Sequence, residues 1–391
     1  MAHRGLKFGI FLAPFHRLGD NPNLAIRRDI EMLEWLDHLG YDEAWIGEHH
    51  SAGWEVIASP ELIIAAAAER TKHIKLGSGV TSLPYHHPLL VAQRFVQLDH
   101  MTRGRAMLGC GPGALVSDAF MMGIPVAKQR DRMDEALDVL APLLRGETVT
   151  HKSDWFELNN ARLQMTPYSR PGVEMAVASQ VSPTGARAAG KHGIGLLSLG
   201  ATSTAGFNAL ASNWAIAEGM AADNGKTVDR SGWRLVGPMH IAETREQAYR
   251  DVEHGIEAWF DYFQHTAAFP QMDVGESSSV KEHIEFVNES GLGAIGTPDD
   301  AVDQIERLVK QSGGGFGAYL QVAQDWAATP AKYRSYELFA RHVAPRFQGH
   351  QQPTLDARAR ARAVRPELAQ SNLAAVEAAT AKYEAELAEG R

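Results

Sequence analysis

Apolar and polar positions alternate along the chain in a repeating two-part pattern. Each unit begins with a short aliphatic run, typical of a buried strand, and continues into a longer segment with helical spacing. In the first unit Ile26, Ile30 and Leu33 recur at that spacing, and Gly40 follows as a helix stop. The aliphatic runs lie at residues 6–15, 41–47, 74–84, 105–113, 173–179, 194–200, 233–242 and 317–323. Strands that alternate with helices in this way indicate parallel βαβ units.

Eight such units predict a (β/α)8 TIM barrel, an α/β fold. The active site of such a barrel is built from the loops at the carboxyl ends of its strands. The competing arrangement, a doubly wound sheet, needs about six strands and an early G-x-G-x-x-G fingerprint. The first run instead continues into A-P-F-H-R-L-G, so the barrel is favoured.

Three segments depart from the repeat. A polar stretch at residues 147–167 predicts a small hairpin, and a helix is predicted from Thr244 to about Gln264. The stretch at residues 269–293 is long for a connector and predicts a substrate lid. Near the end of the chain, an apolar stripe predicts one side of a short terminal helix; its members are Leu373, Val376, Tyr383 and Leu387.

The chain is therefore expected to form one large domain and a tail. We expect a barrel domain at residues 1–348, with a lid-like insertion at about 265–295, and a helical tail at residues 349–391. Two interpretations of the tail stay open, packing on a second subunit and a solvated helix.

Composition and charge narrow the class of partner. The chain has 391 residues and a formal net charge of −9 at pH 7, which disfavours a nucleic acid or an anionic membrane as partner. No stretch reaches the roughly 18 apolar residues of a membrane span. The single cysteine, Cys110, can form neither an internal disulfide nor a zinc–thiolate cluster. We expect a soluble protein in the reducing cytoplasm.

The second predicted strand ends in a group of titratable residues, Glu48, His49 and His50. Adjacent residues of a strand face opposite ways, so at most one of the two histidines points to the barrel mouth. An imidazole there can act as a general base or hydrogen-bond donor near pH 7. A surface histidine in a loop remains the plainer interpretation.

Glycine-rich turns follow the third and fourth predicted strands. Gly77 and Gly79 let the backbone approach a flat ligand closely, and Thr81 or Ser82 adds a hydroxyl group. Relief of crowding inside the barrel explains the same glycines without a ligand. The second turn has Pro112 between two glycines, which indicates a fixed loop shape.

The fifth unit passes from strand to helix through Ser179, Gln180, Ser182 and Thr184. Hydroxyl groups and backbone amides that converge on a helix start suit a phosphate group. Ordinary N-capping by Ser182, with Pro183 at the first helical position, needs no ligand and also stays open.

The sequence lacks the motifs that usually mark a catalytic metal site or a nucleophilic serine. The chain has 17 histidines, but it has neither H-E-x-x-H nor H-x-H after the first strand. It also lacks the G-x-S-x-G elbow of a nucleophilic serine. No metal site is expected.

Several of these segments together resemble a known family. The segments are KFGIFLAPF, GYDEAWIGEHH, SPELIIAAAAERT, VASQVSPTGARAAG and the long run at residues 76–113. In their order and spacing they resemble the bacterial luciferase-like flavin monooxygenase family, over roughly residues 6–347.

The resemblance implies a barrel whose mouth binds reduced FMN or FAD and activates O2. In the family the first histidine of the E-H-H motif assists the flavin–oxygen chemistry, and it corresponds here to His49, with Glu48 beside it. A non-proline cis peptide often follows the third strand. The matching bond joins Gly79 and Val80, with Thr81 near the polar edge of the flavin ring.

The flavin-binding positions implied by the family are spread over four segments that follow predicted strands. They are Ala13, Gly79, Val80, Thr81, Gly111, Ser179, Gln180, Val181 and Ser182, of which the last four match the family's phosphate contacts. One departure matters. The luciferase has a reactive cysteine and a phosphate-binding arginine after the fourth strand, where this chain has Gly111 and Pro112. The light-emitting reaction is therefore not expected.

The implied reaction transfers one oxygen atom from a flavin C4a-hydroperoxide to a small apolar substrate. The favoured case is epoxidation of a monoterpene alkene such as limonene, with His49 protonating or hydrogen-bonding the peroxide. An apolar pocket would exclude water, and Phe11, Trp54 and Tyr85 are candidate walls.

Electrons would come from NADH through a separate flavin reductase, because the chain has no dinucleotide fingerprint. A homo-oligomer is also expected. Three alternatives stay open: a deazaflavin (F420)-dependent hydride-transfer oxidoreductase, a flavin-binding protein without turnover, and a metal-dependent barrel hydrolase.

Overall fold

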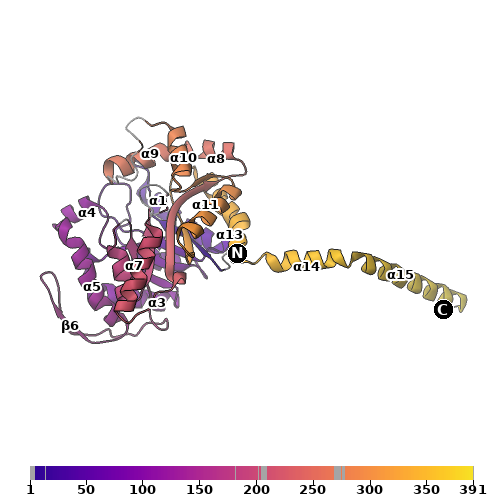
Figure 1. Ribbon diagram of the computed structural model, residues 1–391, viewed down its shortest axis with the longest axis horizontal. Helices are drawn as coiled ribbons and strands as arrows, with labels where there is room; N and C mark the ends of the chain where they lie inside the picture. Colours follow the sequence, from indigo (N-terminus) through magenta and orange to yellow (C-terminus); the bar gives the residue numbers. More distant parts are fainter. Residues whose placement is uncertain are drawn as a thin grey trace. The chain divides into compact units, whose positions relative to one another are not determined.

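The computed structural model describes residues 5–13, 15–180, 182–200, 202–203, 209–267, 274 and 278–390. Its centre is a closed barrel of eight parallel strands surrounded by helices (Figure 1). In barrel order the strands are β1 (Lys7–Leu12), β2 (Glu43–Ile46), β3 (Lys75–Ser78), β5 (Ala106–Gly111), β8 (Glu174–Ser179), β9 (Gly195–Leu199), β10 (Trp233–Ile241) and β12 (Ala318–Val322). Pairing of β10 with β9 and β12, and of β12 with β1, closes the barrel. The predicted fold is confirmed.

Two further strands extend this sheet. β4 (Thr81–Ser82) pairs with β5, and β11 (Ala294–Gly296) pairs with β10. Both are parallel pairings of two or three residues, too short for a hydrophobic pattern to mark them. The predicted polar hairpin is present as the antiparallel strands β6 (Val149–Lys152) and β7 (Glu157–Ala161).

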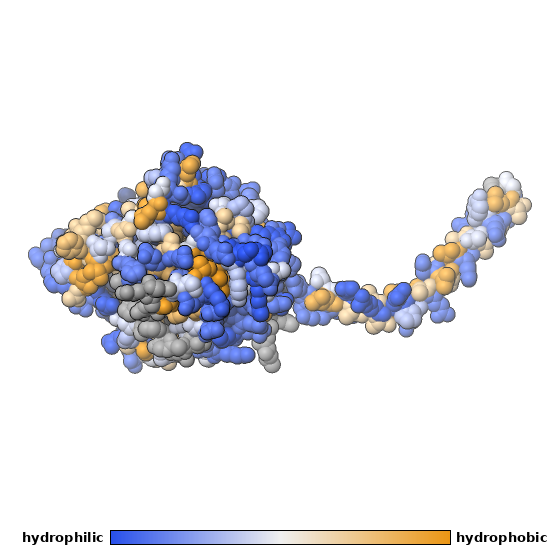
Figure 2. All heavy atoms as spheres, turned by 90° about the horizontal axis from the view of Figure 1, so that it is seen from above, coloured by the Kyte–Doolittle hydropathy of each residue, from blue (hydrophilic) through white to orange (hydrophobic). Residues whose placement is uncertain are grey.

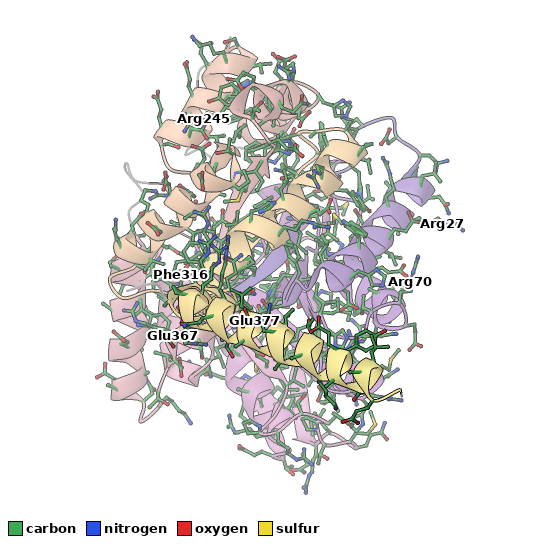
Figure 3. All side chains as sticks on the ribbon, turned by 90° about the vertical axis from the view of Figure 1, so that its right-hand side faces the viewer. Arg27, Arg70, Arg245, Phe316, Glu367 and Glu377 are labelled. Carbon is green, nitrogen blue, oxygen red and sulfur yellow. The ribbon has the colours of Figure 1, made fainter. Side chains whose placement is uncertain are left out.

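Fourteen of the helices that connect, cover or follow the strands are described here by their bounds. They are α1 (Pro22–Leu39), α2 (Pro60–Ala68), α3 (Pro88–Thr102), α4 (Val116–Met121), α5 (Gln129–Leu144), α6 (Thr184–His192), α7 (Leu210–Asp223), α8 (Arg245–Val252), α9 (Ile256–Asp261), α10 (Val280–Glu289), α11 (Pro298–Gln311), α12 (Thr329–Leu338), α14 (Gln352–Ala363) and α15 (Arg365–Ala388). The described residues also form a short α13 (Ala344–Gln348), the π-helical turns η4 (Tyr262–Thr266) and η6 (Phe339–Val343), and the 3-10 turns η1 (Leu83–Tyr85), η2 (Val126–Lys128) and η3 (Arg230–Gly232). Figure 3 shows the charged side chains of the outer helices, such as Arg27 on α1, pointing to solvent.

The barrel interior combines apolar side chains with a buried, ion-paired arginine. Phe11, Trp45 and Leu320 are buried there, and the Arg234 guanidinium donates two hydrogen bonds of 2.9 Å to the Glu43 carboxylate. Glycines make this packing possible. A Cβ added at Gly109 would lie 2.1 Å from the Ser78 carbonyl oxygen, and one at Gly77 would lie 3.0 Å from the Trp45 ring. Relief of crowding therefore accounts for both glycines.

The region after β10 differs from its prediction. The single helix expected from Thr244 to about Gln264 is wrong, because the chain forms α8, a break at Gly255, α9 and the π-helical turn η4. A Cβ at Gly255 would lie 2.1 Å from the Asp325 carbonyl oxygen, so close packing requires glycine at this break. Of the expected lid, residues 268–273 and 275–277 lie outside the described residues. The described remainder contains α10, which begins with a capping box formed by Ser279 and Glu282.

The chain forms two compact units, Met1–Phe347 and Gln348–Arg391. The second unit contains α14 and α15, and none of their residues is buried. The prediction of a short terminal helix is wrong, since α15 alone has 24 residues. Its stripe residues are open to solvent, with Leu373 64% and Tyr383 61% exposed, and Figure 2 shows apolar atoms between polar ones along this unit. None of the helices in the described ranges is both long and apolar enough to span a bilayer.

Candidate active site

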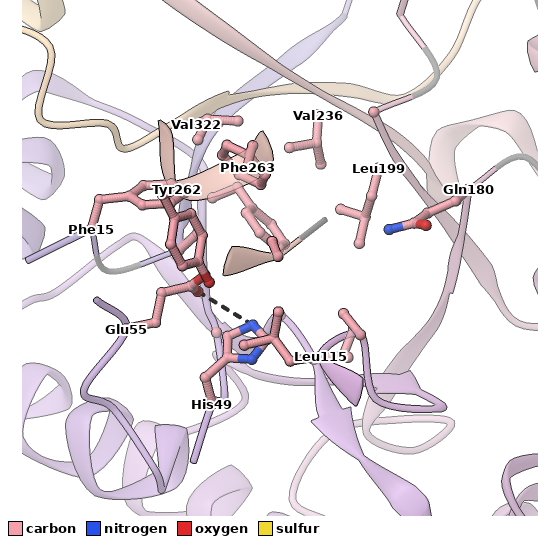
Figure 4. A pocket seen from close by; sticks show the side chains of 18 of the residues that line it. Phe15, His49, Glu55, Leu115, Gln180, Leu199, Val236, Tyr262, Phe263 and Val322 are labelled. Atoms are coloured by element: carbon pink, nitrogen blue, oxygen red, sulfur yellow. Dashed lines mark hydrogen bonds and ion pairs between the residues drawn. The ribbon is translucent and has the colours of Figure 1, made fainter. Parts of the chain in front are cut away.

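A pocket opens at the carboxyl ends of the barrel strands (Figure 4). It encloses about 1060 Å³ between its walls, the open mouth included. The wall is mostly apolar. Aliphatic and glycine positions come from the strand ends, and four aromatic side chains come from the loop after β1 and from α9 and η4. These are Phe15, Trp259, Tyr262 and Phe263.

His49 lies in this wall, between two carboxylates. Its Nε2 atom is 3.3 Å from Glu55 Oε2, and its Nδ1 atom is 3.1 Å from Asp118 Oδ2. Burial by itself would lower the pKa of His49, but the two carboxylates outweigh burial and raise it above its ordinary value. The pocket therefore contains an imidazole whose protonated form is stabilised by two neighbouring carboxylates.

Glu48 also reaches the wall, but its partners are different. Its Oε1 atom lies 2.9 Å from Nε2 of both His50 and His86, and its Oε2 atom accepts a 3.2 Å bond from the Ser82 amide. Burial opposes ionisation of Glu48, yet the hydrogen bonds from the two histidines hold its pKa below the ordinary value. Of the paired histidines only His49 lines the pocket, whereas His50 turns to Glu48.

A hydrogen bond between Glu55 and Tyr262 joins two segments of the pocket wall that are far apart in the sequence. The Tyr262 hydroxyl donates a 2.9 Å hydrogen bond to Glu55 Oε1, although 207 positions separate the two residues. Burial, together with the Glu55 charge, raises the pKa of Tyr262, so this hydroxyl keeps its proton. Tyr262 is the first residue of η4 and is fully buried.

The backbone at Gly79 and Val80 forms another side of the pocket. The peptide bond between them is cis, as the family resemblance implied. A Cβ at Gly79 would lie 2.8 Å from Trp45 Cβ and 2.9 Å from Phe11 Cε2. Glycine alone therefore fits, and the pocket keeps a smooth apolar surface here.

The neighbouring candidates Thr81 and Gly111 lie behind this surface rather than in the pocket wall. Thr81 lies in β4, and its hydroxyl donates a 2.9 Å bond to Ser78 Oγ. A Cβ at Gly111 would lie 2.4 Å from Val80 Cγ2, so this glycine leaves room for the Val80 side chain. Neither residue belongs to the wall itself.

The segment after β8 joins the pocket to the start of α6. Gln180 lines the pocket, and its carbonyl oxygen accepts a 2.9 Å bond from Asn213 Nδ2. Ser179 is buried behind it, and Ser182 is exposed. α6 begins at Thr184 and has no side-chain cap, so the alternative of capping by Ser182 is wrong. Val181 lies outside the described residues.

The remaining wall candidates divide into two groups. Phe11 and Ala13 line the pocket, as do Gly79, Val80 and Gln180. Trp54 does not; it packs behind Tyr262, with ring centroids 5.8 Å apart. Tyr85 also stays outside the wall, and its hydroxyl accepts a 2.9 Å bond from Gln129 Nε2.

Three residues of the polar cluster were not anticipated from the sequence: Glu55, Asp118 and Tyr262. Glu55 follows His49 in the same loop, which is the one signal that could have pointed to it. Asp118 lies on α4, and Tyr262 belongs to a run of aromatics that also fits an ordinary core helix. Within the described ranges, no group of three or more histidine, cysteine or acidic side chains is arranged to hold a metal ion.

The pocket can bind a flat, largely apolar group, and the chain offers donors for a charged end. The wall supplies the surface of Gly79 and Val80, and the side chain of Gln180 lies near the start of α6. Backbone amides in the first turn of a helix have no partner within that helix and attract a phosphate group. These features fit a flavin phosphate ester, with His49 available for proton chemistry.

Comparisons with known proteins agree with this geometry. Residues 6–314 match the family model described as luciferase-like monooxygenase. The chain is 51% identical over 352 residues to limonene 1,2-monooxygenase from Rhodococcus erythropolis, covering 89% of this chain and 88% of the relative. It is 46% identical to 4-hydroxyprotoasukamycin monooxygenase from Streptomyces nodosus subsp. asukaensis, covering 88% and 93%.

A solved structure of similar fold contains a flavin. It is the oxygenating constituent of 3,6-diketocamphane monooxygenase from Pseudomonas putida, a type II Baeyer–Villiger monooxygenase in complex with FMN. The TM-score is 0.73 at 27% sequence identity, and the match covers 88% of this chain and 99% of that one.

Proposed function

This chain belongs to the luciferase-like monooxygenase family, and on that basis we propose that it uses reduced flavin and O2 to insert one oxygen atom into a small apolar substrate. The monooxygenase class expected from the sequence is confirmed. The observation that carries the finer proposal is the position of His49, a protonatable side chain held between Glu55 and Asp118 in a mostly apolar wall.

Reduced flavin, when bound, would supply the oxygen-activating chemistry. We assign its ring to the surface formed by Ala13, Gly79 and Val80, and its phosphate end to the segment from Ser179 to Ser182 at the start of α6. FMN is favoured over FAD by the FMN in the related Baeyer–Villiger monooxygenase. Thr81 and Gly111 would support this surface from behind.

His49 would hold a proton at Nε2, facing the pocket. The two carboxylates raise the pKa of His49 and so stabilise the form that carries this proton. An electrophilic oxygen transfer, such as epoxidation, needs a proton donor near the oxygen that leaves. The apolar wall excludes water and so limits unproductive loss of the activated oxygen. Glu48 would act indirectly, by fixing the two loops that carry His50 and His86.

The proposed substrate is a monoterpene alkene such as limonene, and the proposed reaction is its epoxidation. Two features support it: the name of the relative at 51% identity and the apolar character of the pocket wall. Electrons would come from NADH through a separate flavin reductase, by transient contact or by diffusion of the reduced flavin. Both the NADH supply and the reduced state of Cys110 fit a cytoplasmic location.

We further propose that the chain self-associates through its second unit. α15 exposes an apolar stripe that includes Leu373, Val376 and Tyr383, and a lone helix of this kind is marginal in water. The charges of the unit are divided. α14 carries three arginines, whereas α15 is mainly acidic, with residues such as Glu367 and Glu377 (Figure 3). Antiparallel pairing with a second copy would cover the stripe and bring the opposite charges together.

Sedimentation of the full chain tests this self-association. Val376→Glu places a charge in the stripe and should shift the chain to monomer. Ala378→Glu adds the same charge two positions away, on the opposite side of α15, and should not. A monomeric unmodified chain, or two variants that behave alike, would contradict the proposal.

The oxygenase activity is tested with FMN reduced by a flavin reductase and NADH. O2 uptake and product formation are followed across a panel of terpenes, with catalase present to remove free peroxide, and coupling is the ratio of product formed to O2 consumed. We expect epoxide from at least one terpene alkene and a large loss of coupling in His49→Ala. His151→Ala, which removes a histidine paired with Glu135 on the hairpin, is the matched control. Turnover with F420 in the absence of O2 would favour hydride transfer instead. Flavin binding without turnover would favour a binding protein.

A further inference from the structure

Two carboxylates reach the pocket wall, and they differ in their partners. Glu48 is fully engaged by two histidines and a backbone amide. Glu55 instead lies between the His49 ring and the Tyr262 hydroxyl, with one oxygen atom toward each. Figure 4 shows these three side chains meeting at one side of the pocket.

The backbone that carries Glu55 is held in place. Glu55 forms an antiparallel bridge with Phe15, and the neighbouring Trp54 carbonyl oxygen accepts a 3.0 Å bond from the His16 amide. The Phe15 ring also packs edge-on against Tyr262, with centroids 5.7 Å apart. Glu55 is only 6% exposed. Its carboxylate therefore has a fixed position, and a buried carboxylate in a fixed position can orient the ring beside it.

We propose that Glu55 and Tyr262 are positioning residues. Glu55 fixes the Nε2 edge of the His49 ring from the pocket side, and the Tyr262 hydroxyl fixes the Glu55 carboxylate. This inference rests on the proposed role of His49 and deepens it, because it says what holds the proton of His49 at the pocket face.

The geometry gives the pair a distinct task. Asp118, on the opposite side of the ring, binds Nδ1 but does not line the pocket, so Glu55 is the carboxylate that meets the pocket with Nε2. Without Glu55, Nε2 would be free to rotate away or to lose its proton. Without Tyr262, the Glu55 carboxylate would lose the hydrogen bond that sets its direction.

The charged and titratable groups around His49 come from several elements. Glu48 and Glu55 come from the segment after β2, Asp118 from α4 and Tyr262 from η4; Tyr85, His50 and His86 lie in the same network. Of these groups, Glu48 is shared by two histidines, and Tyr85 and Tyr262 keep their protons. Glu55 and Asp118 therefore remain as the carboxylates in direct contact with His49.

The test measures the protonation of His49 in the flavin-free chain by NMR. Full-length protein is labelled with 13C at histidine Cε1, and the His49 signal, one of 17, is assigned with His49→Ala. Its chemical shift is followed with pH. The matched control is Glu135→Gln, which alters a carboxylate that bridges a histidine and a tryptophan on the hairpin, outside the pocket.

We expect Glu55→Gln to lower the pKa of His49 by about one unit or more, since an opposite charge within about 4 Å shifts a pKa by one to three units. The high-pH limb of the kcat profile should move to lower pH by the same amount. Glu55→Asp keeps the charge and should retain most of the raised pKa. If the pKa of His49 in Glu55→Gln equals the pKa of His49 in Glu135→Gln, then Glu55 does not hold His49 and the proposal is overturned.

Tyr262→Phe separates the orientation of the Glu55 carboxylate from its charge, because the variant removes only the hydroxyl that binds Glu55. Its effect on the pKa of His49 should be smaller than that of Glu55→Gln, whereas kcat should fall about tenfold or more at an unchanged KM for flavin, because misplacement of a reacting group is costly. If Tyr262→Phe has the same His49 pKa and the same kcat as the unmodified protein, Tyr262 contributes only packing, and its part of the proposal is overturned.

Should Glu55→Gln fail to fold, Glu55→Asp decides the matter. The shorter side chain cannot span both His49 and Tyr262, so a raised His49 pKa combined with reduced kcat supports positioning, and unmodified kcat overturns it. The NMR titration needs neither flavin nor substrate. It can therefore support the positioning pair even if no oxygenation is found, and in that case the proposed function alone fails.

Discussion

Loss of the Arg234 guanidinium should destabilise the barrel strongly. Arg234 is completely buried, with two 2.9 Å bonds to Glu43, a further bond to Glu174 and a 3.0 Å bond to the Gly232 carbonyl oxygen. Its guanidinium carbon also lies 5.2 Å from the centroid of the Trp45 ring. Arg234→Met removes all of these contacts at once. Glu43 is then left buried with the Trp45 indole as its main donor.

The size of this effect follows from the desolvation of Glu43. Removing one partner of a buried ion pair costs about 3–5 kcal/mol, because the remaining charge is no longer compensated. By contrast, replacing both partners is often nearly neutral. We therefore expect Arg234→Met to lose about 3–5 kcal/mol of unfolding free energy and the double variant Glu43→Gln/Arg234→Met to recover more than half of that loss.

The assay is urea unfolding followed by tryptophan fluorescence, with equal m-values required for the comparison. Arg70→Met is the matched control. Arg70 forms a 2.7 Å pair with Glu34 on the outer surface (Figure 3), where an ion pair is worth about 0–1 kcal/mol. A loss below about 1 kcal/mol in Arg234→Met would refute the reasoning. So would a double variant no more stable than the single one.

Three further predictions concern the pocket. The pKa of Asp118 lies below its ordinary value, because hydrogen bonds from His49, Ser51 and a backbone amide outweigh burial. Its contribution to stability is thus complete above about pH 4 and lost on acidification, so the melting temperature of Asp118→Asn should fall less than that of the unmodified chain between pH 5 and pH 3. Gly79→Ala should weaken flavin binding at least about tenfold, measured by quenching of flavin fluorescence, since the new methyl group would lie 2.8 Å from Trp45 Cβ and must displace the pocket surface. Val236→Phe narrows the apolar wall and should raise KM for bulky terpenes more than for small alkenes in a comparison of steady-state rates; equal effects on both would contradict its place in the substrate site.

The barrel strands could be predicted because most of their residues are apolar and buried. All residues of β5 and β10 are buried, including the charged Arg234 of β10. β4 and β11 could not, since two or three residues carry no period and their pairing is decided by a neighbouring strand. The break between α8 and α9 was missed for a related reason. The apolar spacing continues across Gly255, and only the tertiary contact with the Asp325 carbonyl oxygen explains why glycine stands there.

The pocket was predictable to the extent that its residues directly follow strands. His49 and Gly79 do so, and the barrel rule alone directs attention to them. Tyr262 has no such signal. Trp259, Tyr262 and Phe263 have the spacing of one helix face, and that pattern is the same whether the face packs on a core or lines a pocket. Their placement depends on the π-helical turn and on the bond to Glu55, which joins two segments 207 positions apart. Sequence periodicity therefore predicts which aromatic side chains are buried. Whether they line a pocket depends on tertiary contacts, such as the hydrogen bond between Tyr262 and Glu55.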